Sequence, residues 1–140
     1  MKRIKPIFFL FSIGAVGYCS LEVLWRGYTH WSMGVTGGMC FLSVFDMNHR
    51  LKKHPWWEKC VIGSFMITSI EFLVGLLVNK LLHWNVWDYS ARRGNLLGQI
   101  CPLYSILWFF LCIPLCYFCK KIEKNLFSPS RQFSRQISSK

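Results

Sequence analysis

Long uncharged stretches alternate along the chain with short segments rich in charged and polar residues. The stretches cover residues 6–21, 27–45, 60–79 and 94–119, and only Glu71 interrupts them with a charge. A helix that crosses the hydrocarbon core of a bilayer needs about 20 mostly apolar residues, each rising about 1.5 Å. The pattern therefore predicts an all-α integral membrane bundle of four transmembrane helices. We expect these helices over about 6–25, 31–47, 59–82 and 97–119.

The overall composition supports a membrane class and leaves room for one domain. Of the 140 residues, 53% are apolar or aromatic and 16% are charged, and the mean hydropathy is +0.30. The numbers of glycine and proline are ordinary, which excludes collagen-like and disordered classes. We expect a four-helix transmembrane domain over 1–119, followed by a basic, flexible cytoplasmic tail over 120–140.

The distribution of positive charge predicts the orientation. Lys and Arg number 17 against six Asp and Glu, for a formal charge of +11. Four crossings place both termini on one side of the membrane with the loop 48–57, and that side carries thirteen of the 17 basic residues. Short cytoplasmic loops attract Lys and Arg, so both termini of this multi-pass cell-membrane protein should be cytoplasmic. Because the charge is divided among segments that flank helices, we expect no nucleic-acid partner.

The amino-terminal segment also resembles a cleavable signal peptide, in which residues 15–17 are a candidate cleavage site. However, the apolar run continues beyond this point through Trp25. Because that length suits a membrane span, we interpret the segment as a retained first helix.

Two helices carry polar residues at helical spacing. Gly14, Tyr18, Glu22 and Arg26 recur every four residues, and a second stripe contains Ser64, Thr68, Glu71, Gly75 and Asn79. A charge at the centre of a membrane helix costs about 2.5–3.5 kcal/mol, so Glu71 must face protein or water, or be protonated. Close helix packing explains the small residues of both stripes. For Glu22 and Glu71, packing and a functional role both stay open.

Several polar and aromatic side chains are expected at a similar depth in the membrane. The external ends of their segments should hold Glu22, Arg26, His30, Trp87, Asp88, Asn95 and Gln99. We hypothesise a substrate-binding polar pocket that opens outward, with Glu71 as its floor and Arg26, His30 and Asp88 on its rim.

Neither the cysteines nor any motif in the sequence points to a metal site, a nucleotide site or a catalytic reaction. Cys112, Cys116 and Cys119 share one helical face, but a zinc site needs a second ligand pair, so we expect no metal. Buried cysteines behave as small apolar residues. A phosphate-binding glycine loop and a complete catalytic motif are both missing from the sequence, so we expect no cofactor and no enzyme activity.

Two segments resemble a known family. RGYTHWSMGVTGG (26–38) and WDYSARRGNLLGQIC (87–101) resemble the signatures of the CmpB-like family, small bacterial membrane proteins described as ABC-transporter type IV permeases. The resemblance extends from about residue 18 to residue 108. The matching positions are Glu22, Arg26, Thr29, His30, Trp31, Gly37, Gly38, Glu71, Trp87, Asp88, Tyr89, Ser90, Asn95, Gly98 and Gln99. The sequence departs from the pattern at Arg93 and Gly94, which puts the loop geometry at this point in question.

The resemblance implies a membrane permease subunit. Such a subunit would draw energy from a separate ATPase subunit or an ion gradient, and four helices suggest a homo-oligomer or a partner membrane subunit. One alternative is an accessory or sensory membrane protein whose polar stripe only fixes an interface. Another is a membrane-embedded enzyme that acts on lipid or envelope precursors, with Glu22, His30, Glu71 and Asp88 as acids and bases.

Overall fold

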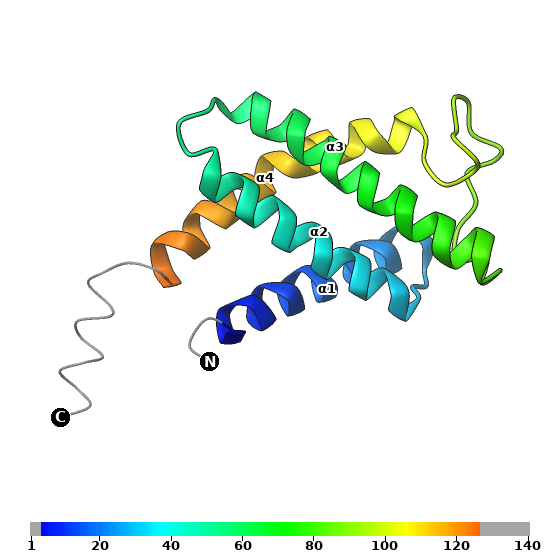
Figure 1. Cartoon of the computed structure of the whole chain (residues 1–140), viewed down its shortest axis with the longest axis horizontal. Helices are drawn as coiled ribbons and strands as arrows, with labels where there is room; N and C mark the ends of the chain where they lie inside the picture. Colours follow the sequence, from blue (N-terminus) through cyan, green and yellow to red (C-terminus); the bar gives the residue numbers. More distant parts are fainter. Residues whose placement is uncertain (1–3, 127–140) are drawn as a thin grey trace.

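A computed structural model describes residues 4–126 of the chain, and helices make up most of this part (Figure 1). The elements in order are α1 (Ile4–Arg26), α2 (Trp31–Arg50), α3 (Trp56–Gly75), η1 (Leu76–Leu81) and α4 (Pro102–Leu126). The predicted all-α class is therefore confirmed. The η1 segment is a π-helix that continues α3, and such segments are uncommon in soluble proteins.

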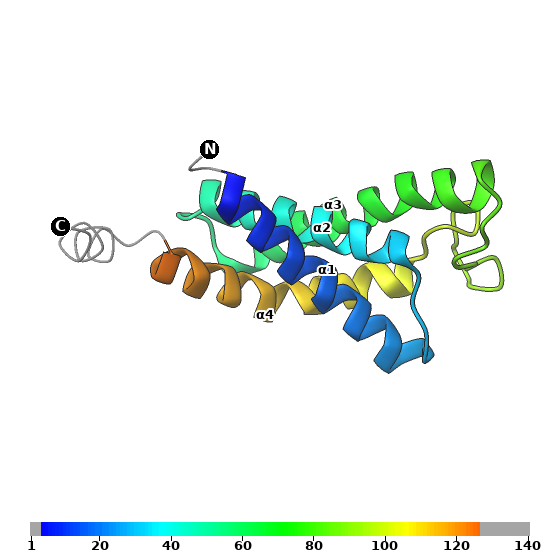
Figure 2. The same ribbon diagram turned by 90° about the horizontal axis from the view of Figure 1, so that it is seen from below.

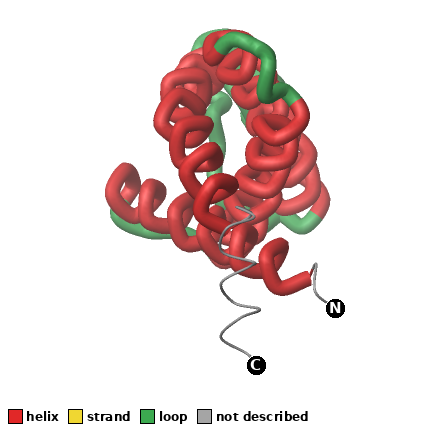
Figure 3. Tube along the Cα trace, turned by 90° about the vertical axis from the view of Figure 1, so that its left-hand side faces the viewer, coloured by secondary structure: helices red, strands yellow, loops and turns green. Residues whose placement is uncertain are grey.

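Consecutive helices run in opposite directions along the bundle. The start of α1, the turn between α2 and α3 and the end of α4 lie together at the left in Figure 1. The connection between α1 and α2 lies at the other end with the segment 82–101, which links η1 to α4. Figures 2 and 3 show α1 running obliquely across the other helices.

Within residues 4–126, three helices are long and apolar enough to cross a membrane. They are Pro6–Arg26, Trp56–Leu81 and Pro102–Asn125. Their outer surfaces are strongly apolar, and Leu24, Phe65 and Phe8 are 85%, 74% and 71% exposed. Because exposed apolar patches of this kind suit lipid better than water, the surface fits a membrane-embedded protein.

The helix α2 is also 20 residues long but is not among these three. Its glycines and hydroxyl side chains lower its apolar content, and Ser32 and Thr36 are buried by neighbouring parts of the chain. The hydropathy pattern therefore gives four helices correctly, while only three of them have the length and composition of a membrane span.

The last helix begins later and ends later than expected. Leu97 and Gly98 have φ values of 53° and 70°, which a right-handed helix does not allow, so the loop continues past residue 97. Pro102 opens α4, a position at which proline loses no helical hydrogen bond. The helix then continues to Leu126, so the first part of the expected tail is helical. The rest of that tail, over 127–140, lies outside the described residues.

Cysteines form much of the bundle core. Cys60, Cys112, Cys116 and Cys119 are at most 5% exposed and pack with apolar side chains such as Val44. All seven cysteines are free thiols. Within residues 4–126, no group of His, Cys, Asp or Glu is arranged to hold a metal ion. The cysteines therefore pack as small apolar side chains, as the helical spacing indicates.

Glycines bring α1 and α2 into close contact. A Cβ atom on Gly14 of α1 would overlap Cβ of Phe41 and would lie 2.6 Å from the carbonyl oxygen of Gly37. A Cβ atom on Gly37 would overlap Cβ of Tyr18. Small residues at helix contacts let two backbones approach closely in a membrane. The spacing of small residues on α1 thus marks the contact with α2.

Candidate functional site

The polar stripe of α3 faces the protein interior. Ser64 Oγ donates a hydrogen bond of 2.5 Å to the Ser105 carbonyl oxygen, and Thr68 Oγ1 lies 3.0 Å from Ser105 Oγ. A Cβ atom on Gly75 would lie 2.5 Å from Oε1 of Gln99. These positions join α3 to α4 and to the loop that precedes α4, which is the packing role expected for the small residues.

Glu71 is the buried carboxyl group at the centre of this stripe, and it is 3% exposed. The Tyr18 hydroxyl of α1 donates to Oε1 at 2.5 Å, and Trp108 Nε1 of α4 donates to Oε2 at 2.8 Å. The rings of Tyr18 and Trp108 lie 5.9 Å apart between centroids. Each carboxyl oxygen thus has a neutral donor from a different helix, and no ion pair reaches Glu71 from residues 4–126.

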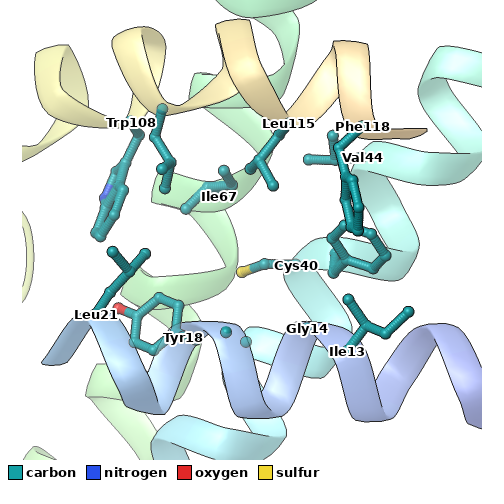
Figure 4. Close-up of a pocket in the computed structure, with 14 residues that line it drawn as sticks. Ile13, Gly14, Tyr18, Leu21, Cys40, Val44, Ile67, Trp108, Leu115 and Phe118 are labelled. Atoms are coloured by element: carbon teal, nitrogen blue, oxygen red, sulfur yellow. The ribbon is translucent and has the colours of Figure 1, made fainter. Parts of the chain in front are cut away.

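Two adjoining cavities lie between α1 and α4. They measure about 260 and 220 Å³ and share four wall residues: Tyr18, Leu21, Trp108 and Leu111. The walls of the larger cavity are almost entirely apolar, and Figure 4 shows them coming from all four helices. Its other lining residues include Ile13, Gly17, Cys40, Val44, Ile67, Leu115 and Phe118.

The smaller cavity extends toward the end of α1, and two charged side chains lie in its mostly apolar and aromatic wall. Glu22 and Arg26 line it, and Arg26 Nη2 donates to Glu22 Oε1 at 2.8 Å. Thr29 Oγ1 donates to the second carboxylate oxygen of Glu22 at 2.9 Å, and Arg26 Nη1 donates to the Val86 carbonyl oxygen at 3.1 Å. Glu22 and Arg26, one helical turn apart, thus form an ion pair that also anchors the loop after η1.

Asn79 and Gln99 fold this loop back onto the bundle. Asn79 Oδ1 accepts from the Val86 backbone N–H at 2.7 Å, and its Nδ2 donates to Gln99 Oε1 at 2.9 Å. Trp87 Nε1 donates to the Gln99 carbonyl oxygen at 2.9 Å. Trp87 and Gln99 are buried, and neither side chain lines the two cavities.

Asp88 lies on the exposed part of the same loop. Its Oδ1 accepts from the Ser90 hydroxyl at 2.5 Å and from the Ser90 backbone N–H at 2.8 Å. These two bonds hold the pKa of the Asp88 carboxyl below its usual value, because they stabilise the charged form. A Cβ atom on Gly98 would lie 2.8 Å from Asp88 Oδ1, so the backbone there needs glycine for space and for its φ of 70°.

Asn95 closes the turn in which Arg93 and Gly94 depart from the family pattern. Its Nδ2 donates to the carbonyl oxygens of Ser90 and Arg92, and its Oδ1 accepts from the Gly98 backbone N–H at 3.0 Å. Gly94 has a φ of 70°, which suits glycine. The local backbone thus accommodates Gly94 in a turn held by Asn95.

His30 stabilises the start of α2. Its Nδ1 accepts from the Ser32 backbone N–H at 3.3 Å, in the position of an N-cap. Its ring packs against Trp31 and Trp84, each 5.6 Å away between centroids. His30 does not line either cavity.

The eight expected site residues are therefore distributed over several surroundings. Glu22 and Arg26 line the smaller cavity, and Glu71 lies directly behind two of its wall residues. The other five cap a helix or shape the loop: His30, Trp87, Asp88, Asn95 and Gln99. The sequence interpretation did not include Tyr18 and Trp108 in the site, although Tyr18 belongs to the four-residue stripe of α1. Trp108 has no comparable signal.

Comparison with known proteins identifies a family but no individual relative. No curated protein and no solved structure matches the chain. One family profile matches residues 4–139, which is almost the whole chain and includes both segments that resemble the CmpB-like signatures. With three helices long and apolar enough to cross a membrane, the match indicates a multi-pass membrane protein of the ABC-transporter type. The chain therefore belongs to the family that this profile describes, "Putative ABC-transporter type IV".

Proposed function

We propose that the chain is a membrane-spanning permease subunit of an ABC-type transporter in the cell membrane, with four transmembrane helices. Family membership and three membrane-length helices support this proposal. As a 20-residue helix, α2 has a length of about 30 Å, enough for the hydrocarbon core. Its polar face is covered by other parts of the chain, which suits a fourth span in the middle of a bundle.

We propose further that both termini are cytoplasmic. More of the described basic residues lie at the end of the bundle that holds the α2–α3 turn than at the opposite end. They are Arg50, Lys52, Lys53, Lys59, Lys120, Lys121 and Lys124. The opposite end has Arg26, Lys80, Arg92 and Arg93. The rule that Lys and Arg accumulate on the cytoplasmic side then orients the bundle. Single-cysteine variants at Lys53 and Arg92, made in a cysteine-free chain, test this with a membrane-impermeant thiol reagent: in intact cells only the Arg92 position should react.

The substrate site in this proposal is the pair of cavities between α1 and α4, with Glu22, Arg26 and Glu71 as its polar groups. The observation that carries the proposal is the burial of Glu71 beside these cavities in the middle of a membrane-length helix. Ionisable groups inside a membrane are costly and mark substrate or ion pathways. His30, Trp87, Asp88, Asn95 and Gln99 support the external end of the site in this proposal, because they order the connections around it.

The energy source in this proposal is a separate ATPase subunit. The sequence contains no phosphate-binding glycine loop, so ATP hydrolysis has to occur on another chain. The cytoplasmic turn between α2 and α3 offers a docking position for that chain. Two cavities of this size leave little room for a wide path, so we also propose a second copy or another membrane subunit.

Purification of the tagged chain from its native membrane tests the proposal directly. An ATP-binding subunit should co-purify, and the complex in lipid nanodiscs should hydrolyse ATP. Glu71→Gln should abolish coupled transport while expression and co-purification stay normal. Glu58→Gln is the matched control, since Glu58 lies at the start of the same helix and, within residues 4–126, its carboxylate pairs with His54 alone. Full transport by the Glu71 variant would contradict the proposed site.

A second candidate function is supported by the same contacts. Both oxygens of Glu71 already accept hydrogen bonds within the chain, as expected if the stripe only fixes an interface in an accessory or sensory protein. Under this alternative, Glu71→Gln weakens assembly and causes no separate transport defect. The acids and bases expected for an enzyme lie in different surroundings within residues 4–126, so we do not propose an enzyme.

A further inference from the structure

We propose that the cavities between α1 and α4 bind a lipophilic organic cation that enters sideways from the bilayer. This inference rests on the proposed function, because it names the substrate class of the site proposed above. It depends on the charges around the cavities, on the two aromatic rings that separate them from Glu71, and on the place where the cavities open.

The charges around the cavities are unbalanced. Glu22 and Arg26 line the smaller cavity and pair with each other at 2.8 Å. Glu71 lies behind the shared wall, and no Lys, Arg or His of residues 4–126 forms an ion pair with it. The surroundings thus contain two carboxyl groups and one guanidinium. Glu71 has no cationic partner among these residues, so a cation bound nearby would favour its ionised form, and this attraction is stronger in apolar surroundings than in water.

Tyr18 and Trp108 are placed to receive this cation. Both side chains line both cavities, and both donate a hydrogen bond to Glu71. An O–H or N–H bond of an aromatic side chain lies in the plane of its ring, so these bonds direct the ring edges at the carboxyl group. A cation within about 6 Å of a ring centre is attracted to the ring face. The carboxyl group behind the rings adds to that attraction without requiring contact.

The larger cavity suits the apolar part of such a molecule. Its lining is almost entirely apolar, and Figure 4 shows Ile13, Val44, Leu115 and Phe118 around it. The two cavities together fall within the range of about 300–1,000 Å³ that is typical of small-molecule pockets. The site therefore offers an apolar chamber beside aromatic rings and a carboxyl group, which matches a bulky apolar molecule with one positive charge.

The cavities open on the side of the bundle. Leu21, Leu107 and Phe118 line them and are 45%, 40% and 42% exposed on the molecular surface. The opening lies between α1 and α4, whose exposed surfaces are apolar and suit lipid. A cation that partitions into the bilayer reaches this opening without crossing the polar loop 82–101.

Equilibrium binding of radiolabelled tetraphenylphosphonium to the full-length protein in nanodiscs tests the inference. Tetraphenylborate, which has a similar shape and the opposite charge, is the ligand control. Glu71→Gln removes the ionisable carboxyl group and keeps the side-chain shape. Gly17→Leu fills the larger cavity, since a Cβ atom on Gly17 meets nothing within 4 Å. Ser20→Leu is the matched control on α1, because Ser20 does not line these cavities.

We expect saturable binding of the cation that weakens by about tenfold or more in Glu71→Gln and in Gly17→Leu and is unchanged in Ser20→Leu. Thermal unfolding of each variant checks that the fold is retained, and Gly17→Leu decides the result if Glu71→Gln does not fold. Absence of saturable binding overturns the inference. So does equal binding of the borate anion, or binding that Gly17→Leu leaves unchanged.

These outcomes separate the ligand class from the proposed permease activity. If the cation binds as expected but no ATPase co-purifies and no uptake occurs, the inference on the site holds and the permease proposal fails. If an ATPase drives uptake of another solute and the cation does not bind, the permease proposal holds and this inference fails.

Discussion

The helix α1 contacts its two neighbours in opposite ways. Against α2 it packs so closely that Gly14 and Gly37 leave no space for a Cβ atom. Against α4 it leaves two cavities, where contact depends on side chains such as Tyr18 and Trp108. One helix thus combines a fixed backbone contact on one face with a fillable space on another. The closest backbone contact of α1 is thus with α2, and the space at the α1–α4 boundary supports the ligand site proposed above.

The largest expected effect comes from enlarging a glycine in the close contact. Gly14→Leu should lower the free energy of unfolding by about 3 kcal/mol or more, because the added atoms meet Phe41 Cβ and the α2 backbone. Gly17→Leu, three residues away on the same helix, should change it by less than about 0.5 kcal/mol. Unfolding in mixed detergent micelles measures both. Equal losses would show that the two faces of α1 do not differ in packing.

The next effect tests the side chains that join α1 to α4. Tyr18→Phe or Trp108→Phe leaves one oxygen of the buried Glu71 without its donor, which should cost about 1–3 kcal/mol of unfolding free energy. Tyr104→Phe is the control, since no hydrogen bond to the Tyr104 hydroxyl occurs within residues 4–126. A loss in the control as large as in Tyr18→Phe would assign the effect to the loss of any tyrosine hydroxyl and not to the bond with the carboxyl group.

A smaller effect is expected where α1 meets the loop 82–101. Arg26→Gln removes the bond to Glu22 and weakens the bond to Val86, which should cost about 1 kcal/mol because the pair is only partly exposed. Arg50→Gln removes a pair with the same four-residue spacing to Asp46 on the open surface, where solvent screens the charges, so its cost should be smaller. The same unfolding measurement compares them. A larger loss from Arg50→Gln would refute the importance of burial for these pairs.

The smallest effect lies outside both contacts of α1. Ser90→Ala removes the hydroxyl donor to Asp88 and should raise the pKa of that carboxyl toward its ordinary value. Since the folded-state pKa is depressed, the charged carboxyl stabilises the folded chain above the unfolded pKa, and this contribution is lost as pH falls through the folded pKa. NMR titration of the Asp88 carboxyl carbon measures the shift. An unchanged pKa would leave the backbone N–H as the effective donor.

The sequence predicts the helical framework because the spacing of charges directly reflects the length of each apolar run. It misplaces the start of α4 because Leu97, Ile100 and Cys101 belong to an uncharged stretch that looks helical. What prevents a helix there is a set of contacts between distant residues, including the bond from Asn79 to Gln99. Such contacts leave no periodic signal.

For the candidate site, the sequence predicts the acidic residues better than their neighbours. The cost of a charge in lipid requires that Glu71 face protein, and its 3% exposure agrees. The depth of a residue along its helix gives no information about how the helix is rotated. Depth alone therefore grouped His30 and Asp88 with Arg26, although their side chains meet different partners. The sequence does not distinguish Trp108 from other aromatic residues. An aromatic side chain in a membrane helix can face lipid as readily as it can face a buried carboxyl group.

The modest apolar content of α2 has a consequence for how the protein is made. A helix with buried Ser32, Thr36 and Gly37 gains little by entering lipid alone, whereas α1 is strongly apolar and emerges from the ribosome first. In the four-span arrangement proposed above, the two should therefore insert together as a hairpin, in which the glycine contact covers the polar face of α2. A gene split within the α2–α3 turn would then still yield an assembled protein from its two halves, while a split at Gly27 would leave α2 outside the bilayer.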